Sequence, residues 1–314
     1  MAIEITIMQK GSSRKALPFE VIIGDELMYG RSDGTLLLED IIGEGRFIAY
    51  NPKHIGRGFS VEWKEGETYK VSLRLTIPSH DEEIDDFYDA VTRIAIYWGN
   101  CKIRQDKKVL SLDSFAFQRS ETKAKSFKML SDLCNKTKID KDGIPITEVN
   151  FDKLTPYYEA EIYLHCAKWP LILGGEEKAM LADSTDSLNF KEFLHEKQVI
   201  SAYYAKAFYY QHPETKKFHA KFGIDENNPS IFPLKPEVPE WLIDRSTGKQ
   251  IEIDNWEIML FSTTKDEVLG EMPYADFIAR LKNAQYYDPK NVLIQGVTLA
   301  EMEELLEAGT SIVQ

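Results

Sequence analysis

Apolar and polar residues alternate along two neighbouring stretches between Gly58 and Pro78. Every second residue is apolar over 59–63, and the alternation returns over 69–77 after a turn at 64–67. A period of two residues is typical of a strand that buries one face, so we predict an antiparallel hairpin here. Pro78 ends the second strand because it has no backbone donor for the ladder.

A helical pattern follows the hairpin. Ser79 and Glu82 have the spacing of a capping box, so we expect Ser79 to cap the helix. The acids from Asp81 to Asp86 crowd its first two turns, and we interpret them as helix-start chemistry rather than as a metal or catalytic site. Apolar residues then recur every three or four positions and predict a helix that packs on the hairpin: Ile84, Phe87, Tyr88, Val91, Ile94, Ala95 and Trp98.

The same patterns predict the remaining elements and an α+β fold class, in which amphipathic helices pack on one face of antiparallel hairpins and sheets. In the first part of the chain we expect strands near 2–8, 19–24, 101–105 and 109–118, and a helix near 121–134. Further on we expect a helix near 189–197, hairpins over 199–224 and 241–261, a Pro-punctuated loop over 227–241, a helix after Pro273, a strand over 292–294, and a last helix capped by Thr298 and Glu301.

Composition changes along the chain divide it into three regions. We predict an N-terminal α+β region over 1–135, a connector over 136–150 that holds turn residues and Pro145, and a C-terminal α+β region over 151–314. Both α+β regions contain a hairpin followed by a helix, which makes them candidates for two related modules. Convergence on a common motif explains this pattern equally well.

Composition and charge exclude several classes of protein. The chain has 314 residues, of which 43% are hydrophobic and 28% are charged, and its formal net charge is −13. No apolar run reaches the length of a membrane span and the first residues alternate like a strand, so we expect a cytoplasmic protein without a membrane partner. The negative charge repels phosphate backbones, so we expect no nucleic-acid partner, and we interpret the basic segment Arg119–Lys141 as a solvated helix face.

Signatures of common enzymes are absent from the sequence. We find no phosphate-binding glycine loop, no dinucleotide fingerprint, no nucleophile elbow and no zinc-protease motif. His165 and Cys166 are neighbours, and neighbours in a strand point to opposite faces, so they do not form a nucleophile pair. The three cysteines and six histidines show no ligand spacing, so we expect no disulfide framework, no metal site and no cofactor: Cys101, Cys134, Cys166, His54, His80, His165, His195, His212 and His219.

The hairpin over 199–224 carries the best candidate binding site. If Gln211 pairs with Phe218, one face of the hairpin is apolar from Tyr203 to Ile224 and belongs in the core. The other face is aromatic and cationic, suited to stacking on a ligand ring or to meeting an acidic partner: Tyr204, Lys206, Phe208, Tyr210, His219 and Lys221. The alternative is that another element covers this face.

Three short runs connect the chain to a known family. They are Gly56-Arg-Gly58-Phe59, Leu75-Thr-Ile-Pro78 and Asp85-Asp-Phe87-Tyr88. Together they resemble an uncharacterised bacterial family of about 300 residues that is labelled only as a domain of unknown function. The resemblance implies a bacterial cytoplasmic protein but no activity, cofactor or catalytic residue.

Two functional hypotheses follow. The leading one is a non-enzymatic protein-interaction or binding module whose partner is another protein, because catalytic signatures are missing and hairpins and tyrosines are abundant. The alternative is a hydrolase-type enzyme that uses carboxylates or a Tyr/His pocket without a sequence signature. A deep pocket that holds a strongly perturbed Asp, Glu or His would favour the enzyme.

Overall fold

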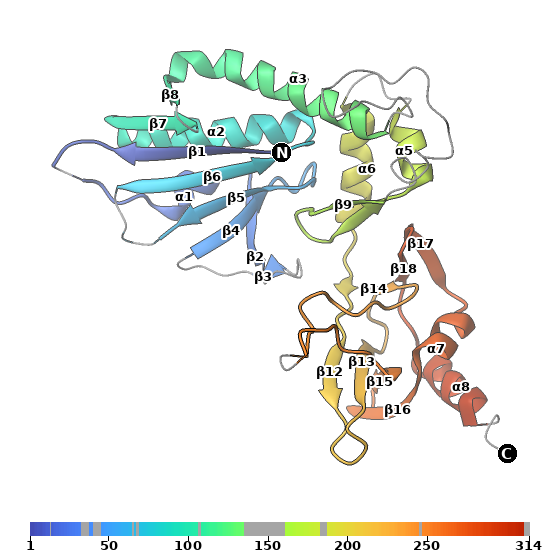
Figure 1. The fold of residues 1–314 in the computed structure, drawn as a ribbon. Coiled ribbons are helices and arrows are strands. Elements are labelled where there is room, and N and C mark those ends of the chain that lie inside the picture. The colour runs from blue at the N-terminus through green and yellow to red at the C-terminus, as the bar shows by residue number, and fades with distance from the viewer. Residues whose placement is uncertain are drawn as a thin grey trace. The chain divides into compact units, whose positions relative to one another are not determined.

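The chain folds into two compact units, Met1–Ile200 and Ser201–Gln314, named here the N-terminal and C-terminal units. The computed structural model describes residues 1–12, 14–32, 38–39, 45–64, 66, 69–105, 108–134, 161–182, 187–244 and 247–310 (Figure 1). The division at residue 200 comes after the predicted connector 136–150, which lies outside the described residues. Both units combine helices with antiparallel-rich sheets, so the fold class is α+β.

One eight-stranded antiparallel sheet forms the N-terminal unit's centre, with strand order β3-β2-β4-β5-β6-β1-β7-β8. The predicted hairpin is β5–β6, and Phe59 pairs with Leu75, which confirms the hairpin. The strands are β1 (Ala2–Gln9), β2 (Met28–Ser32), β3 (Leu38–Glu39), β4 (Gly45–Tyr50), β5 (Phe59–Trp63), β6 (Lys70–Thr76), β7 (Cys101–Gln105) and β8 (Lys108–Leu110).

Helices cover one face of this sheet (Figure 1). The apolar stripe of α2 (Asp81–Trp98) is buried as predicted, and α2 contacts β1, β6 and β7. Phe87 and Phe59 meet edge to face, with 5.6 Å between ring centroids. Gly99 ends α2 with a positive φ of 63°, and its N–H donates to the carbonyl of Ala95.

The start of α2 differs from the prediction by one residue. His80, not Ser79, is the N-cap, and its Nδ1 accepts the N–H of Glu83 at 3.2 Å. The Ser79 side chain instead donates to the carbonyl of Thr76, and its backbone N–H and carbonyl both bond the hydroxyl of Ser126. The prediction that Ser79 caps α2 was therefore wrong, because the backbone of Ser79 is hydrogen-bonded to Ser126 of a neighbouring helix.

Two predicted strands of this unit are also wrong. Residues predicted as a strand near 19–24 form the short helix α1 (Phe19–Ile23), which packs on α2, so packing overrides the strand preference of its β-branched residues. In the predicted strand 109–118, only β8 is extended, and a 3₁₀ turn (Leu112–Ser114) leads into α3 (Phe115–Cys134). Phe115 is drawn into the core beside Tyr88, at 5.7 Å between ring centroids.

Residues 161–200 complete the N-terminal unit. The chain there forms the strand pair β9 (Ile162–Leu164) and β10 (Leu171–Leu173), then α5 (Gly175–Ala182) and the predicted helix α6 (Leu188–Gln198). This segment is attached to the rest of the N-terminal unit, because α5 contacts α3 and the N–H of Ala167 donates to the carbonyl of Gly56. These contacts explain why the unit extends to residue 200.

The C-terminal unit has two four-stranded sheets, with orders β12-β13-β15-β16 and β11-β14-β18-β17. Its apolar core includes Phe222, Phe232, Ile258 and Phe277. The elements are β11 (Tyr203–Tyr204), β12 (Phe208–Gln211), β13 (Phe218–Asp225), β14 (Ser230–Pro233), β15 (Asn255–Ser262), β16 (Glu267–Pro273), α7 (Tyr274–Arg280), β17 (Ala284–Asp288), β18 (Asn291–Ile294) and α8 (Leu299–Thr310).

Several predictions for this unit need correction. The hairpin expected over 241–261 is shifted: the paired strands are β15 and β16, while Ile243 and Gln250 form only an isolated bridge. The loop expected over 227–241 contains β14, because only Pro233 falls inside the strand and it lies at the strand's last position. The Thr298–Glu301 capping box is confirmed by bonds in both directions.

None of the helices in the described ranges is long and apolar enough to cross a membrane.

Candidate functional site

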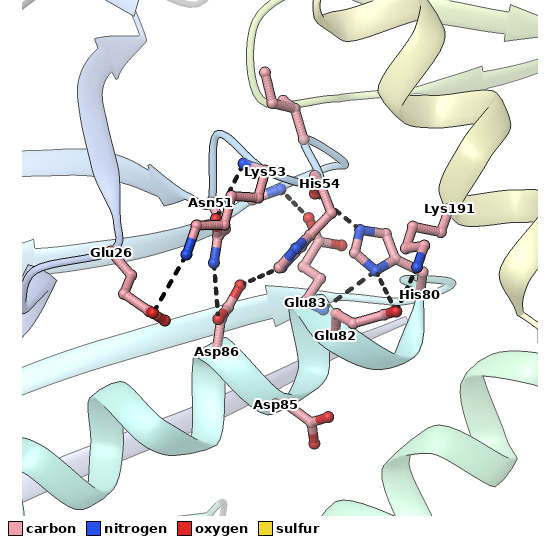
Figure 2. Close-up of polar contacts among 12 residues, drawn as sticks. Glu26, Asn51, Lys53, His54, His80, Glu82, Glu83, Asp85, Asp86 and Lys191 are labelled. Carbon is pink, nitrogen blue, oxygen red and sulfur yellow. Dashed lines mark hydrogen bonds and ion pairs between the residues drawn. The ribbon is translucent and has the colours of Figure 1, made fainter.

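Two histidines that are far apart in the sequence meet at the start of α2 (Figure 2). His54 lies in the loop over 51–58 between β4 and β5, and His80 caps the helix. Their rings stand edge to face with centroids 5.4 Å apart, and the Nε2 of His80 lies 3.2 Å from the carbonyl oxygen of His54. The His80 side chain is fully buried, whereas that of His54 is 19% exposed.

A carboxylate on the second turn of α2 orients the exposed histidine. The Nε2 of His54 lies 2.8 Å from Asp86, and Asn51 donates to the other oxygen of the same carboxylate at 3.4 Å. When the ring is neutral, its Nε2–H donates to Asp86 and Nδ1 is the proton-accepting nitrogen. The carboxylate therefore fixes the orientation of the His54 ring.

Glu82 links His80 to α6. Its carboxylate lies 3.3 Å from the Nδ1 of His80 and 2.6 Å from the Nζ of Lys191. The hydrogen bond from His80 lowers the pKa of Glu82 most; burial opposes this, and the bond from Lys191 lowers the pKa further, to well below its ordinary value. Lys191 bonds the other oxygen of the Glu82 carboxylate, so α6 is tied to the start of α2 through Glu82.

Two charged side chains are buried behind the histidines. One oxygen of Glu83 accepts the N–H of Gly58, and its other oxygen is buried without a hydrogen-bond partner in the described part of the chain. Arg57 donates to the carbonyls of His165 and Pro78, and burial lowers its pKa while the nearby Cys166 and Glu83 oppose the shift. These bonds fasten the loop to Pro78, just after β6, and to His165.

The loop needs a glycine where it passes the cluster. A Cβ at Gly56 would lie 2.8 Å from both Glu83 and the Nε2 of His80, closer than atoms can approach. On the other side, the N–H of Ile55 donates to the Nδ1 of His195 on α6 at 3.0 Å. The cluster is thus a tightly fitted junction of loop, α2 and α6, with His54 and Asp86 at its edge.

Other chemistry at this junction is limited. Burial raises the pKa of Cys166 to about 12, so its thiol is not an activated nucleophile. Across the residues that the structure describes, no three His, Cys, Asp or Glu side chains are grouped so that they could hold a metal ion.

Sequence reasoning missed this site because its members meet only in the fold. Asp86 was interpreted as one of the acids of a helix start, and its partner His54 is 32 residues away in an irregular loop. The one signal in the sequence is the close pair Gly56 and Gly58, which marks a close backbone approach.

Four of the six residues that were predicted to form a binding face lie together on one face of a sheet in the C-terminal unit. Gln211 pairs with Phe218 as predicted, which places Phe208, Tyr210, His219 and Lys221 on one face of the sheet; they are named here the aromatic face. Their rings form a row, because Phe208 stacks on Tyr210 at 6.2 Å and 25°, and Tyr210 lies 5.4 Å from His219. Phe208 is 69% exposed.

The other two predicted residues lie apart from this face. Tyr204 belongs to β11, which pairs with β14 in the other sheet, and Lys206 lies between β11 and β12. The hairpin is shorter than predicted, and Tyr203, expected in the core, is 38% exposed. None of Tyr204, Phe208 and Tyr210 is fully buried, whereas His219 is 8% exposed, so the aromatic face is open at Phe208 and Tyr210 but not at His219.

Polar contacts stabilise the aromatic face. Lys221 pairs with Glu271 at 2.6 Å and lies 5.5 Å from the ring of Tyr210, whose hydroxyl donates to Glu257 at 3.2 Å. Burial, and then the negative charge of Glu257, raise the pKa of Tyr210, so its hydroxyl stays protonated. The charges of this face are therefore matched to one another, and Phe208 is its exposed apolar group.

Comparison with known proteins matches the chain to a family. A family model described as "Domain of unknown function (DUF4299)" matches residues 2–305. No curated protein and no solved structure matches the chain.

Proposed function

The chain belongs to this family of unknown function, and from that premise we propose that it is a binding module whose aromatic face captures a segment of a partner protein. The observation that carries the proposal is the exposure of Phe208, at 69%, at the end of a row of stacked rings. Burying a Phe side chain on binding contributes about 1.5–3 kcal/mol. Rings of this kind are enriched in protein interfaces.

The position of the aromatic face favours an extended segment. Strand β12 is at the edge of its sheet, with β13 as its neighbour on one side only. An added strand bonds to such an edge through its backbone and places alternate side chains on the face beside it. Phe208 and Tyr210 alternate along β12, so an extended segment with apolar or aromatic side chains at alternate positions fits them.

The test uses a random peptide library displayed on phage and selected on the intact protein. The Kd of a selected peptide is then measured by fluorescence anisotropy for wild type and Phe208→Ala. We expect tenfold or greater weakening, with an unchanged melting temperature because Phe208 packs on the surface. Phe117→Ala is the matched control, since Phe117 is 67% exposed on α3. Equal binding to wild type and Phe208→Ala would overturn the proposal.

A second candidate function rests on the His54–Asp86 pair. A partly exposed imidazole that is fixed by a carboxylate at 2.8 Å is the arrangement of a general base, which keeps the hydrolase hypothesis open. Hydrolysis of nitrophenyl ester and phosphate substrates is the measurement, with His54→Asn as the test variant and His212→Asn as the control. Any turnover that survives in His54→Asn at the wild-type rate rules this candidate out.

A further inference from the structure

The face of the N-terminal sheet opposite the helices carries an unusual set of charges. Ile5, Val61 and Leu73 are buried under the helices. Because side chains alternate along a strand, the residues next to them in the sequence lie on the opposite face of the sheet. The pairing registers align these neighbours in rows across the sheet. One row runs from β4 to β7: Arg46, Glu62, Ser72, Thr6 and Arg104.

Two more rows add to the positive charge. Lys70, Met8 and Lys102 lie side by side on β6, β1 and β7, and Arg74 lies beside Glu4. Five cations thus share the face with two acids, Glu4 and Glu62. The cations are named here the basic face: Arg46, Lys70, Arg74, Lys102 and Arg104. This excess is opposite to the chain's net charge of −13.

The cations of the basic face make no ion pair with any carboxylate of the described residues. Helix α3 shows a contrast, because two of its cations pair with carboxylates of α2. Its Arg119 pairs with Asp85 and Asp89, and its Lys123 pairs with Asp85 at 2.7 Å. We expected the basic segment from Arg119 to be a solvated helix face. This is correct only in part, since Arg119 and Lys123 form ion pairs with acids of α2.

The basic face is also hollowed. A depression of about 360 Å³ is lined by Lys70 and Arg104 with Thr6 and Met8 between them and Glu4 at one end. Its walls offer two cations and a hydroxyl to a ligand, and Lys70 and Arg104 are both exposed. A carboxylate that enters between them gains two charge-assisted hydrogen bonds.

We infer that the basic face binds an acidic segment of a partner protein. Charge complementarity supports this occupant, because the five cations have no ion pair with any described carboxylate and outnumber the two acids of the face, so they attract carboxylates and repel basic chains. Nucleic acid fits less well. The rows hold no aromatic side chain on which a base could stack, and Glu4 and Glu62 interrupt the cations, which opposes a regular chain of phosphates. This inference is independent of the aromatic face and its partner.

The probe is a fluorescein-labelled peptide of glutamates, titrated with the intact protein in 50 mM NaCl. We expect binding that weakens at least tenfold in the double variant Lys70→Glu with Arg104→Glu. The control is Lys235→Glu with Lys249→Glu, two exposed lysines of the C-terminal unit that change the net charge equally. Melting curves of all variants confirm folding, and Lys70→Gln with Arg104→Gln gives a milder second variant.

Three outcomes decide the inference. Weakening in the basic-face variants with unchanged binding in the control supports it. Equal weakening in the control shows a response to net charge alone and overturns it. Tighter binding of a single-stranded oligonucleotide of equal charge, lost in the same variants, assigns the face to nucleic acid and also overturns it.

Discussion

Each unit has one sheet face with exposed side chains, but the charges of the two faces are arranged in opposite ways. On the aromatic face of the C-terminal unit, Lys221 is paired with Glu271 at 2.6 Å and the open feature is the Phe208 ring. On the basic face of the N-terminal unit, the cations are unpaired within the described residues and no ring is present in their rows. One face offers apolar area, and the other offers charge.

This difference indicates two kinds of recognition in one chain. Burial of rings is short-ranged and nearly independent of salt, whereas attraction between exposed charges is screened within about 10 Å at 0.1 M salt. Both faces arise because side chains alternate along the strands, so the sheet topology alone does not distinguish them. The two faces differ in the chemistry of the side chains at the outward positions.

The largest expected effect is the loss of stability when the core beneath each face is disrupted, which tests whether each face belongs to its own folding unit. Phe87 and Phe277 are both fully buried, one in each core. Phe87→Ala and Phe277→Ala should each lower the free energy of unfolding by about 3–5 kcal/mol, through lost burial and the cavity left behind. Calorimetry should show that each variant shifts one transition and leaves the other in place. Melting curves identical to wild type would refute the packing of these rings.

Salt should separate the two faces by an intermediate effect. Between 50 and 500 mM NaCl, the glutamate peptide should lose at least tenfold in affinity, about 1.4 kcal/mol, because screening removes its attraction to the basic face. A peptide selected on the aromatic face should change by less than twofold. The two titrations use the same protein sample, so equal salt dependence of both peptides would erase the distinction between the faces.

The smallest expected effect compares the stability lost when a paired carboxylate and an unpaired carboxylate of the described N-terminal unit are each neutralised by substitution. The pKa of Glu82 is lowered in the folded state, so its contribution is present above the unfolded pKa of about 4.3 and is lost as the pH falls through the folded value. Glu82→Gln should cost about 0.2–1 kcal/mol at pH 7, since the side chain is 40% exposed and solvent screens it.

Thermal unfolding at pH 7, 4 and 3 measures this, and the gap between wild type and Glu82→Gln should narrow as the pH falls. Glu4→Gln is the control, since Glu4 has no ion pair with any described residue. It should leave stability nearly unchanged and strengthen binding of the glutamate peptide. A gap that widens towards pH 3 would contradict the role of Glu82.

Local periodicity made much of the fold predictable. The hairpin β5–β6, the buried stripe of α2 and the pairing of Gln211 with Phe218 all follow from periods of two or 3.6 residues, and the structure confirms them. Short segments were less predictable. The residues of α1 have strand preferences, and only contact with α2 makes them helical.

The candidate sites depended on contacts that no local pattern contains. Four members of the aromatic face belong to one hairpin, so its register alone could place them. His54 and Asp86, in contrast, meet because a loop folds over the start of a helix, and Lys191 arrives from more than a hundred residues away. The five residues of the basic face come from three strands, β4, β6 and β7, so only the sheet order brings them together.

The imidazole at the start of α2 limits which residues can replace it. Serine, threonine, asparagine and aspartate are ordinarily interchangeable as helix caps, because each needs to supply one acceptor. His80 supplies an acceptor to Glu83 and, from the opposite side of its ring, a donor to the carbonyl of His54. A single short side chain does not span both. Replacing His80 therefore removes a hydrogen bond to the loop and a hydrogen bond to the helix N-terminus at the same time. We expect substitutions of His80 that preserve the fold to be accompanied by changes in residues 54–58.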